Sequence, residues 1–273
     1  MLPAFLADVS VTTGEVPPLE EKDTQKGVLW QACPGKFRMD VPDIARYLVT
    51  DGHAVRIEPA PNALSITVEQ FFRMTPLGAV VYQRGLLPLH ATAICKGTGA
   101  VVLAGDSGVG KSTLAAELLL RGWKLLGDDI ALIDLAPANE ITAHSTFDGL
   151  ALWPDSVKKL GLAAGEASCD SSRRMWSPPG SFEPEEKIVR AIFYLGVYGK
   201  EAVDLSDIRG AAKFRAPLEL SYNSHIADAL LDKASYMRIG TVISQCIPIY
   251  RLLRPRGAWC ASELADIVER TIS

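Results

Sequence analysis

The sequence VVLAGDSGVGKSTLAAELLLRGWKLLGDD, residues 101–129, decides the fold of this chain. Residues 105–112 match the pattern G-x-x-x-x-G-K-[ST], which is typical of a phosphate-binding loop (P-loop). A short apolar run at 100–104 precedes the loop and predicts a strand, and residues 112–121 place apolar side chains at helical spacing. A strand, a glycine-rich loop and a helix in this order predict an α/β protein that binds nucleotide phosphates.

The loop residues explain how phosphate would be held. Glycines let the backbone curl so that successive N–H groups point at phosphate oxygens, and the N-terminus of the following helix adds positive charge. Lys111 is expected to reach the β- and γ-phosphates, and the Ser112 hydroxyl is expected to bind Mg²⁺. The predicted site for ATP and Mg²⁺ consists of Gly105, Asp106, Ser107, Gly108, Val109, Gly110, Lys111, Ser112 and Thr113.

Two adjacent carboxylates, Asp128 and Asp129, follow the predicted strand at 123–126. Neighbouring side chains on a strand point to opposite faces, so only one carboxylate faces the γ-phosphate unless the chain turns there. One can bind Mg²⁺, with Asp128 as the candidate, and the other can accept the proton of an attacking hydroxyl. Which carboxylate has which role stays open from the residues alone. His90 is a further catalytic candidate, because a predicted hairpin can return it to the loop.

The rest of the chain is expected to surround this core in three parts. Residues 1–27 predict a solvated arm, residues 28–75 a small α+β unit, and residues 76–273 the P-loop domain, beginning with a helix at 76–87. In the small unit we expect strands at 28–33, 36–41, 54–59 and 65–68 and a helical turn or two at 43–48. In the larger part we expect strands at 92–95, 123–126, 130–135, 188–197 and 247–253, a surface loop at 168–184, and helices at 216–234 and 263–271.

Composition excludes several classes of protein. A net charge of −4 gives no indication of nucleic-acid binding, and no apolar run approaches the length of a membrane span. The N-terminus lacks the pattern of a secretory signal peptide. The five cysteines form no C-x-x-C pair, which indicates reduced thiols and a cytoplasmic protein. His53, His144 and His225 have no companions at metal-ligand spacing.

Several cations and aromatic residues have two interpretations. A transition-state cation is expected, and the sequence does not choose among Lys187, Arg190, Lys213 and Arg215. Arg173 and Arg174 fit a solvated loop better than a ligand contact, and Trp153 and Trp176 fit packing better than a peptide groove.

His90, the P-loop and the segment RGWKLLGDD, residues 121–129, resemble the catalytic core of the HPr kinase/phosphorylase family. In that family a histidine, a P-loop and an Asp-Asp pair follow one another in this order, and the resemblance covers residues 88–135. It implies the α/β fold of HPr kinase and phosphoenolpyruvate carboxykinase, with the P-loop on a bent mixed sheet. It also implies that Asp129 accepts the proton of a substrate serine, that Asp128 and His90 support it, and that the protein is a homo-oligomer. Thr113 departs from the family, which usually has glutamate there.

The sequence is also similar to the HPr-kinase-like proteins encoded with lasso-peptide genes. The similar segments are QRGLLPLHATA, GKSTL, GWKLLGDD and LWPD, at residues 83–93, 110–114, 122–129 and 152–155. This resemblance implies an ATP-dependent kinase that phosphorylates a serine hydroxyl, the C-terminal one, of a precursor peptide. The alternatives are an HPr-type protein kinase and a non-catalytic nucleotide-binding switch. Carboxykinase-like chemistry would need further histidine and lysine metal ligands, and no such cluster is seen in the sequence.

Overall fold

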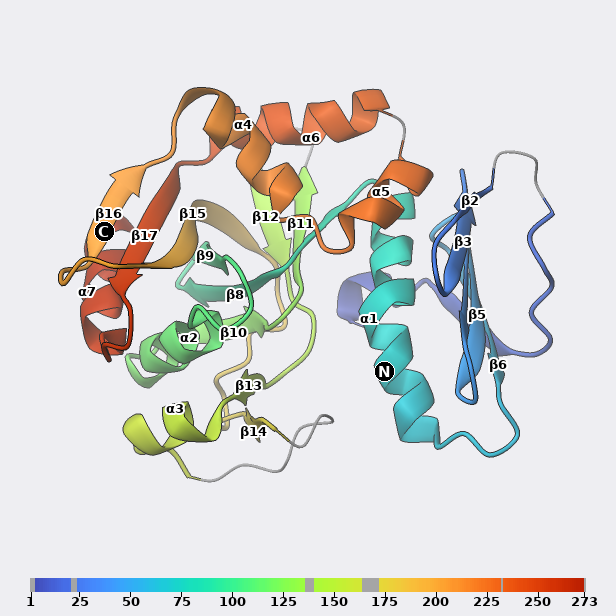
Figure 1. Cartoon of the computed structure of the whole chain (residues 1–273), viewed down its shortest axis with the longest axis horizontal. Helices are drawn as coiled ribbons and strands as arrows, with labels where there is room; N and C mark the ends of the chain where they lie inside the picture. Colours follow the sequence, from blue (N-terminus) through green and yellow to red (C-terminus); the bar gives the residue numbers. More distant parts are fainter. Residues whose placement is uncertain (1–2, 21–23, 136–139, 164–171, 232, 273) are drawn as a thin grey trace. The chain divides into compact units, whose positions relative to one another are not determined.

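The computed structural model describes residues 3–20, 24–135, 140–163, 172–231 and 233–272. The chain forms two compact units (Figure 1). Unit 1 comprises residues 1–88 and 221–239, and unit 2 comprises residues 89–220 and 240–273. The divisions fall within β7 (Leu87–Leu89), after Leu220, and within α6 (Lys233–Cys246). The domain boundaries expected at residues 27 and 75 stay a prediction.

Unit 1 is a six-stranded sheet with a long helix, α1 (Ser65–Gln83), packed against β4 and β5. Alternating burial along β4 explains this layer, because one face of the strand meets the helix and the other meets solvent. The buried Tyr47 hydroxyl also donates a hydrogen bond of 2.8 Å to the Val68 carbonyl oxygen of α1. The other elements are η1 (Ala4–Leu6), β1 (Ser10–Thr13), β2 (Gln25–Lys26), β3 (Trp30–Cys33), β4 (Lys36–Val41), β5 (Ala45–Thr50), β6 (Ala54–Pro59) and α5 (Ser224–Leu230).

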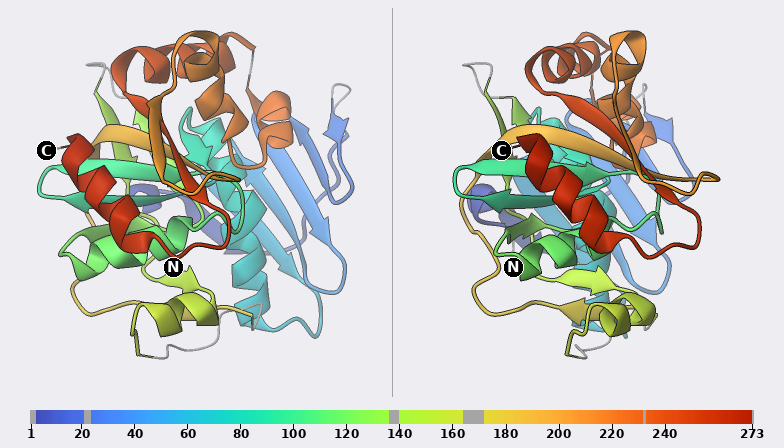
Figure 2. Two further views of the ribbon diagram at one scale, coloured as in Figure 1. Left: turned by 60° about the vertical axis from the view of Figure 1, so that its left-hand side comes forward. Right: turned by 90° about the vertical axis from the view of Figure 1, so that its left-hand side faces the viewer.

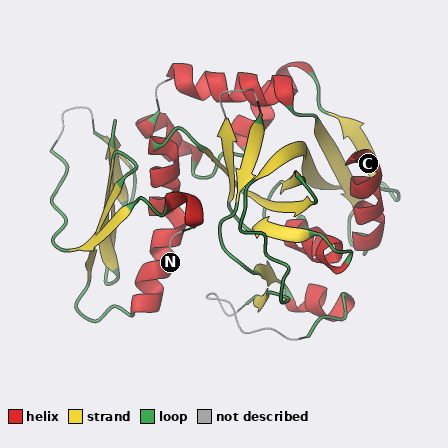
Figure 3. Cartoon of the chain, turned by 180° about the vertical axis from the view of Figure 1, so that it is seen from behind, coloured by secondary structure: helices red, strands yellow, loops and turns green. Residues whose placement is uncertain are grey.

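Unit 2 is built on a mixed sheet, in which β10, β8, β9, β15, β12 and β11 are neighbours in that order. The long strand β15 runs parallel to β9 and to β17, whereas β8 and β9 form an antiparallel hairpin. Strands and helices are distinguished in Figure 3. The elements are β8 (Ala91–Lys96), β9 (Gly99–Ala104), α2 (Lys111–Leu120), β10 (Lys124–Gly127), β11 (Ala131–Leu135), β12 (Ile141–His144), β13 (Leu150–Leu152), α3 (Pro154–Lys159), β14 (Arg174–Trp176), β15 (Lys187–Tyr198), β16 (Asp204–Asp207), α4 (Gly210–Glu219), β17 (Ile249–Pro255) and α7 (Ala261–Ile272).

The main core of unit 2 lies between its sheet and the helices α2 and α7, which pack against each other (Figure 2). Leu103 of β9, Leu118 of α2 and Val268 of α7 are fully buried there. Strand β9 is apolar over nearly its whole length because both of its faces are covered. This core fixes the end of β9, and therefore the start of the P-loop, against the helix that follows it.

The structure confirms the expected α/β class, with a P-loop on a mixed sheet and a small N-terminal α+β unit. It also confirms the predicted hairpin and the strands and helices near 123–126, 130–135, 188–197, 247–253 and 263–271. Residues 164–171 of the expected loop lie outside the described residues, and residues 174–176 pair with β13.

Four local predictions were wrong. Residues 65–68 form the first turn of α1, where tertiary packing overrides the strand propensity of Ile66 and Val68. Residues 45–50 form β5, because pairing with β4 buries Tyr47. The arm contributes β1, which pairs in parallel with β6. The helix expected at 216–234 is interrupted near Asn223, which has a φ of 52°.

We expect the Arg121 side chain to hold α2 to α7. Its guanidinium donates to Asp266 at 2.6 Å and to Glu269 at 3.1 Å, and it is only 22% exposed. Arg121→Ala should therefore lower the free energy of unfolding by about 1–3 kcal/mol, measured by urea denaturation. The control is Arg209→Ala, whose partner is Asp207 and whose side chain is 82% exposed; it should leave the free energy of unfolding nearly unchanged. Equal losses in the two variants would contradict this role.

Candidate active site

The P-loop adopts a backbone path that only glycine permits at its start. Gly105 has a φ of 134°, and a Cβ added there would lie 2.4 Å from the carbonyl oxygen of Leu195 on β15. Gly108 and Gly110 also have positive φ, and α2 begins at Lys111. The strand, loop and helix predicted from the sequence are therefore present in the expected order.

The Lys111 side chain folds back onto the start of the P-loop. Its Nζ donates to the Gly105 carbonyl oxygen at 2.8 Å and the Asp106 carbonyl oxygen at 3.2 Å, and it lies 3.1 Å from Nε2 of His90. Burial lowers the pKa of Lys111, and the carboxylates of Asp129 and Asp128 oppose that effect. The ammonium group is thus held where phosphate oxygens can replace the loop carbonyls as its partners.

Asp128 is the acceptor of three hydrogen bonds. Thr92 Oγ1 and Ser112 Oγ donate to its Oδ1 at 2.6 and 3.0 Å, and the Ala151 N–H donates to Oδ2 at 3.0 Å. Burial raises the pKa of the carboxyl group, and the three hydrogen bonds act in the opposite direction. A hydroxyl and a carboxylate in contact at a P-loop are hard oxygen ligands of the kind Mg²⁺ takes together with water and phosphate, so Ser112 and Asp128 fit this ion.

Asp129 has a different environment from its neighbour. Strand β10 ends at Gly127, and Asp129 has a φ of 69°, so the chain turns and the two carboxylates diverge. The Asp129 side chain is 61% exposed, and its Oδ1 lies 3.6 Å from Nδ1 of His90. The sequence left open which carboxylate faces the P-loop. The left-handed turn at Asp129 directs Asp128 towards Ser112 and leaves Asp129 exposed beside His90.

His90 lies between Lys111 and Asp129. Burial and the positive charge of Lys111 lower the pKa of His90, while Asp129 and Asp128 raise it. A neutral imidazole that accepts from the Lys111 ammonium at Nε2 carries its proton on Nδ1, the nitrogen that faces Asp129. The three side chains form a row in the order Lys111, His90, Asp129, all within unit 2.

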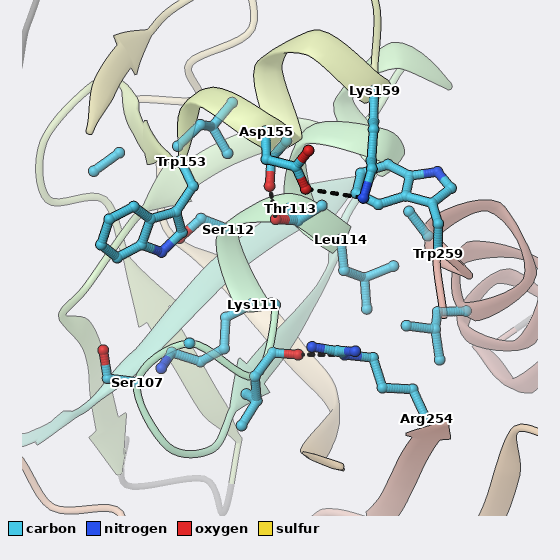
Figure 4. A pocket seen from close by; sticks show the side chains of 18 of the residues that line it. Ser107, Lys111, Ser112, Thr113, Leu114, Trp153, Asp155, Lys159, Arg254 and Trp259 are labelled. Carbon is cyan, nitrogen blue, oxygen red and sulfur yellow. Dashed lines mark hydrogen bonds and ion pairs between the residues drawn. The ribbon is translucent and has the colours of Figure 1, made fainter. Parts of the chain in front are cut away.

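A cavity of about 310 Å³ contains these groups and extends past the loop (Figure 4). Ser107, Gly108, Val109, Gly110, Ser112 and Thr113 line it, as do Trp153 and Arg173, and Trp176 is half-buried against the main core. Gly105 and Asp106 contact Lys111 but do not line the cavity.

Arg254, at the end of β17, is a cation of the cavity that the sequence did not identify. It lines the cavity, and its Nε donates to the Val109 carbonyl oxygen at 2.8 Å. Lys187, Arg190, Lys213 and Arg215 are not among the lining residues, and Lys187 pairs with Glu183 and Glu185.

The other histidines are not part of this cavity. His144 contacts Asp134 and Glu186, and none of His53, His144 and His225 lines the cavity. Within the described ranges, no cluster of three or more His, Cys, Asp or Glu side chains is arranged to hold a metal ion. Over the same residues, no helix has the length and apolar character needed to cross a membrane.

Comparisons with known proteins give distant likenesses to solved structures. No family model matches the chain, and no curated protein does. The solved structure of the Hpr(Ser) kinase/phosphatase from Coxiella burnetii matches with 15% sequence identity and a TM-score of 0.35. The match covers 67% of this chain and 91% of that chain. A likeness at this level carries no conclusion about the activity of this chain.

In the absence of Mg²⁺, the substitution Asp128→Asn should change the free energy of unfolding by an amount that depends on pH. The folded pKa lies above the value of about 3.9 in the unfolded chain, so the folded state binds more protons between the two values. The stability that Asp128 contributes is present below that unfolded value and is lost as the pH rises through the folded pKa. Urea denaturation should therefore find Asp128→Asn more stable, relative to the unchanged protein, at pH 7 than at pH 4. The opposite trend would contradict the dominance of burial at this carboxyl group.

Proposed function

We propose that this protein is a Mg²⁺-ATP-dependent phosphotransferase that moves the γ-phosphate to a serine hydroxyl. The observation that carries the proposal is the different placement of the two adjacent carboxylates. Asp128 accepts a hydrogen bond from the P-loop residue Ser112, whereas Asp129 is exposed beside His90. One carboxylate is therefore suited to holding the metal and the other to accepting a proton, which is the division of roles that phosphoryl transfer to a hydroxyl needs.

Ser112 and Asp128 would hold the Mg²⁺ ion of Mg-ATP. When bound, the ion neutralises charge on the β- and γ-phosphate oxygens. The other two hydrogen bonds to Asp128, from Thr92 and Ala151, keep its carboxylate facing the loop. The positions of these two oxygen ligands are set before nucleotide arrives.

Lys111 and the loop amides would stabilise the charge of the transferring phosphoryl group. Lys111 Nζ exchanges the Gly105 and Asp106 carbonyl oxygens for phosphate oxygens, and the N-terminus of α2 adds its positive end. Arg254, held against the Val109 carbonyl oxygen, supplies a second cation at the same cavity.

Asp129 would accept the proton of the attacking hydroxyl. The serine oxygen forms a bond to the γ-phosphorus while the bond from that phosphorus to the β–γ bridging oxygen breaks, and ADP leaves. The proton of the hydroxyl goes to Asp129. His90 acts as a positioning residue, because its Nδ1–H faces the Asp129 carboxylate and its Nε2 faces Lys111.

A peptide is the acceptor we favour, with the C-terminal serine of a lasso-peptide precursor as the specific proposal. Asp129 is 61% exposed, so a serine carried by a large molecule can approach it from solvent. The sequence segments that resemble the lasso-peptide kinases include His90, the end of the P-loop from Gly110 to Ser112, and both carboxylates. An HPr-type protein acceptor is the alternative, and the same site would serve it.

The test compares Asp129→Asn with the unchanged protein. Removing the base should lower the transfer rate by about 10²–10⁴-fold while leaving the affinity for ATP within about threefold. The assay uses γ-labelled ATP, Mg²⁺ and two acceptors, a lasso-precursor peptide ending in serine and HPr. Lys111→Ala should abolish transfer, and Asp204→Asn, an exposed residue of β16, is the control that should change nothing.

The labelled product distinguishes the candidates. Label on the peptide that disappears in Asp129→Asn supports the peptide kinase, and label on HPr alone supports the HPr-type kinase. A normal rate in Asp129→Asn contradicts the role of that carboxylate. Tight ATP binding with neither acceptor labelled contradicts both acceptors and favours a nucleotide-binding switch.

A further inference from the structure

A tryptophan paired with a cation lies at each end of the cavity (Figure 4). The Arg173 guanidinium carbon lies 5.2 Å from the ring centroid of Trp153, and Lys159 Nζ lies 5.1 Å from that of Trp259. All four side chains line the cavity. Figure 4 shows Trp153 and Trp259 on opposite sides of the first turn of α2. The two ends therefore offer similar aromatic surfaces, one to the acceptor and the other to the nucleoside.

The proposed reaction determines which end faces the nucleoside. In phosphoryl transfer the attacking and leaving oxygens lie roughly in line on opposite sides of the phosphorus. The acceptor approaches from Asp129, so the leaving diphosphate extends away from it. Trp153 contacts Arg173, whose positive charge lowers the pKa of His90, the neighbour of Asp129, so this pair lies on the acceptor side. The diphosphate then runs past Thr113 and Leu114 towards Trp259.

The cavity around Trp259 has the chemistry of a site for a flat, uncharged ring. The Trp259 side chain is 43% exposed, and Leu114, Cys260, Ala261 and Leu264 line the same region. Aromatic side chains stack on bases through their π-faces, with little dependence on hydrogen bonding. Lys159 covers part of the indole and is held by Asp155, 2.9 Å from its Nζ. Its contact limits the movement of the ring.

We infer that the Trp259 end of the cavity is the nucleobase subsite, and that Trp259 stacks on a purine base. Lys159 is a positioning residue that orients the indole. The two-ring face of a purine covers more of the Trp259 indole than a pyrimidine does, so stacking favours purine nucleotides modestly. The inference rests on the proposed function, because the in-line transfer decides at which end of the cavity the nucleoside lies. It goes beyond that function by assigning the base to particular residues.

The first test compares nucleotides with inorganic tripolyphosphate, which has the phosphates but no base. Trp259→Ala should weaken ATP binding about tenfold or more, as measured by isothermal titration calorimetry with Mg²⁺, and change tripolyphosphate binding less than twofold. Trp259→Phe should restore most of the affinity, since it keeps an aromatic face. The unchanged protein should bind ATP more tightly than CTP, and Trp259→Ala should reduce this difference. Trp153→Ala is the matched control, and it should leave the ratio of ATP to tripolyphosphate affinity unchanged.

The second test needs no substitution, because Cys260 lies beside Trp259 and lines the cavity. ATP should slow alkylation of Cys260 by N-ethylmaleimide, followed by peptide mass spectrometry, whereas tripolyphosphate should not. Exposed Cys246 is the internal control and should react equally in all samples.

The inference is overturned if Trp259→Ala weakens ATP and tripolyphosphate equally or weakens neither. It is also overturned if Trp259→Phe loses as much affinity as Trp259→Ala, or if ATP leaves Cys260 unprotected. ATP binding that depends on Trp259 without phosphorylation of any acceptor would contradict the proposed transfer reaction but support the base subsite. Absence of binding by both ATP and tripolyphosphate would contradict both proposals.

Discussion

The site depends on the three hydrogen bonds that Asp128 accepts. They join the start of α2 through Ser112, strand β8 through Thr92, and strand β13 through the Ala151 N–H. A half-buried carboxylate is costly unless such donors surround it, so these segments are constrained to meet at one point. The same contacts bring the hydroxyl of the P-loop and a carboxylate together as a pair of oxygen atoms of the kind that Mg²⁺ prefers. They also leave the next residue, in a left-handed turn, to face solvent.

Lys111, His90 and Asp129 form a row in which each group influences the protonation state of its neighbour. Lys111 is buried, yet three neighbouring carboxylates favour its charged form. His90 is kept neutral by burial and by Lys111, and can therefore accept from one neighbour and present a proton to the other. A neutral imidazole is a better bridge here than a charged one, which would repel the Lys111 ammonium 3.1 Å away.

The sequence predicted the parts of the site that depend on local pattern. The loop, its helix, the hairpin carrying His90 and the Asp-Asp pair all lie within about 40 consecutive residues, where spacing and turn signals carry the information. It did not predict Arg254 or Trp259 as cavity residues. They reach the P-loop only because β17 pairs in parallel with β15, which also pairs with β9, and such non-local pairing leaves no local signature. The local predictions that failed include the strand at 65–68 and the helical turn at 43–48. Tertiary packing decides the secondary structure of these segments, because their β-branched or mixed composition does not.

The central claim is that Asp128 holds the metal and Asp129 does not. It is tested most directly by titrating Mn²⁺, an EPR-active substitute for Mg²⁺, into the protein with a non-hydrolysable ATP analogue. The Mn²⁺ affinity of Asp128→Asn and Asp129→Asn is then compared with that of the unchanged chain. The account predicts that Asp128→Asn weakens Mn²⁺ binding about tenfold or more, because it replaces a charged oxygen ligand with a neutral one, and that Asp129→Asn leaves it within about twofold. Strong weakening by Asp129→Asn, with normal binding in Asp128→Asn, would show that the two roles have been assigned the wrong way round.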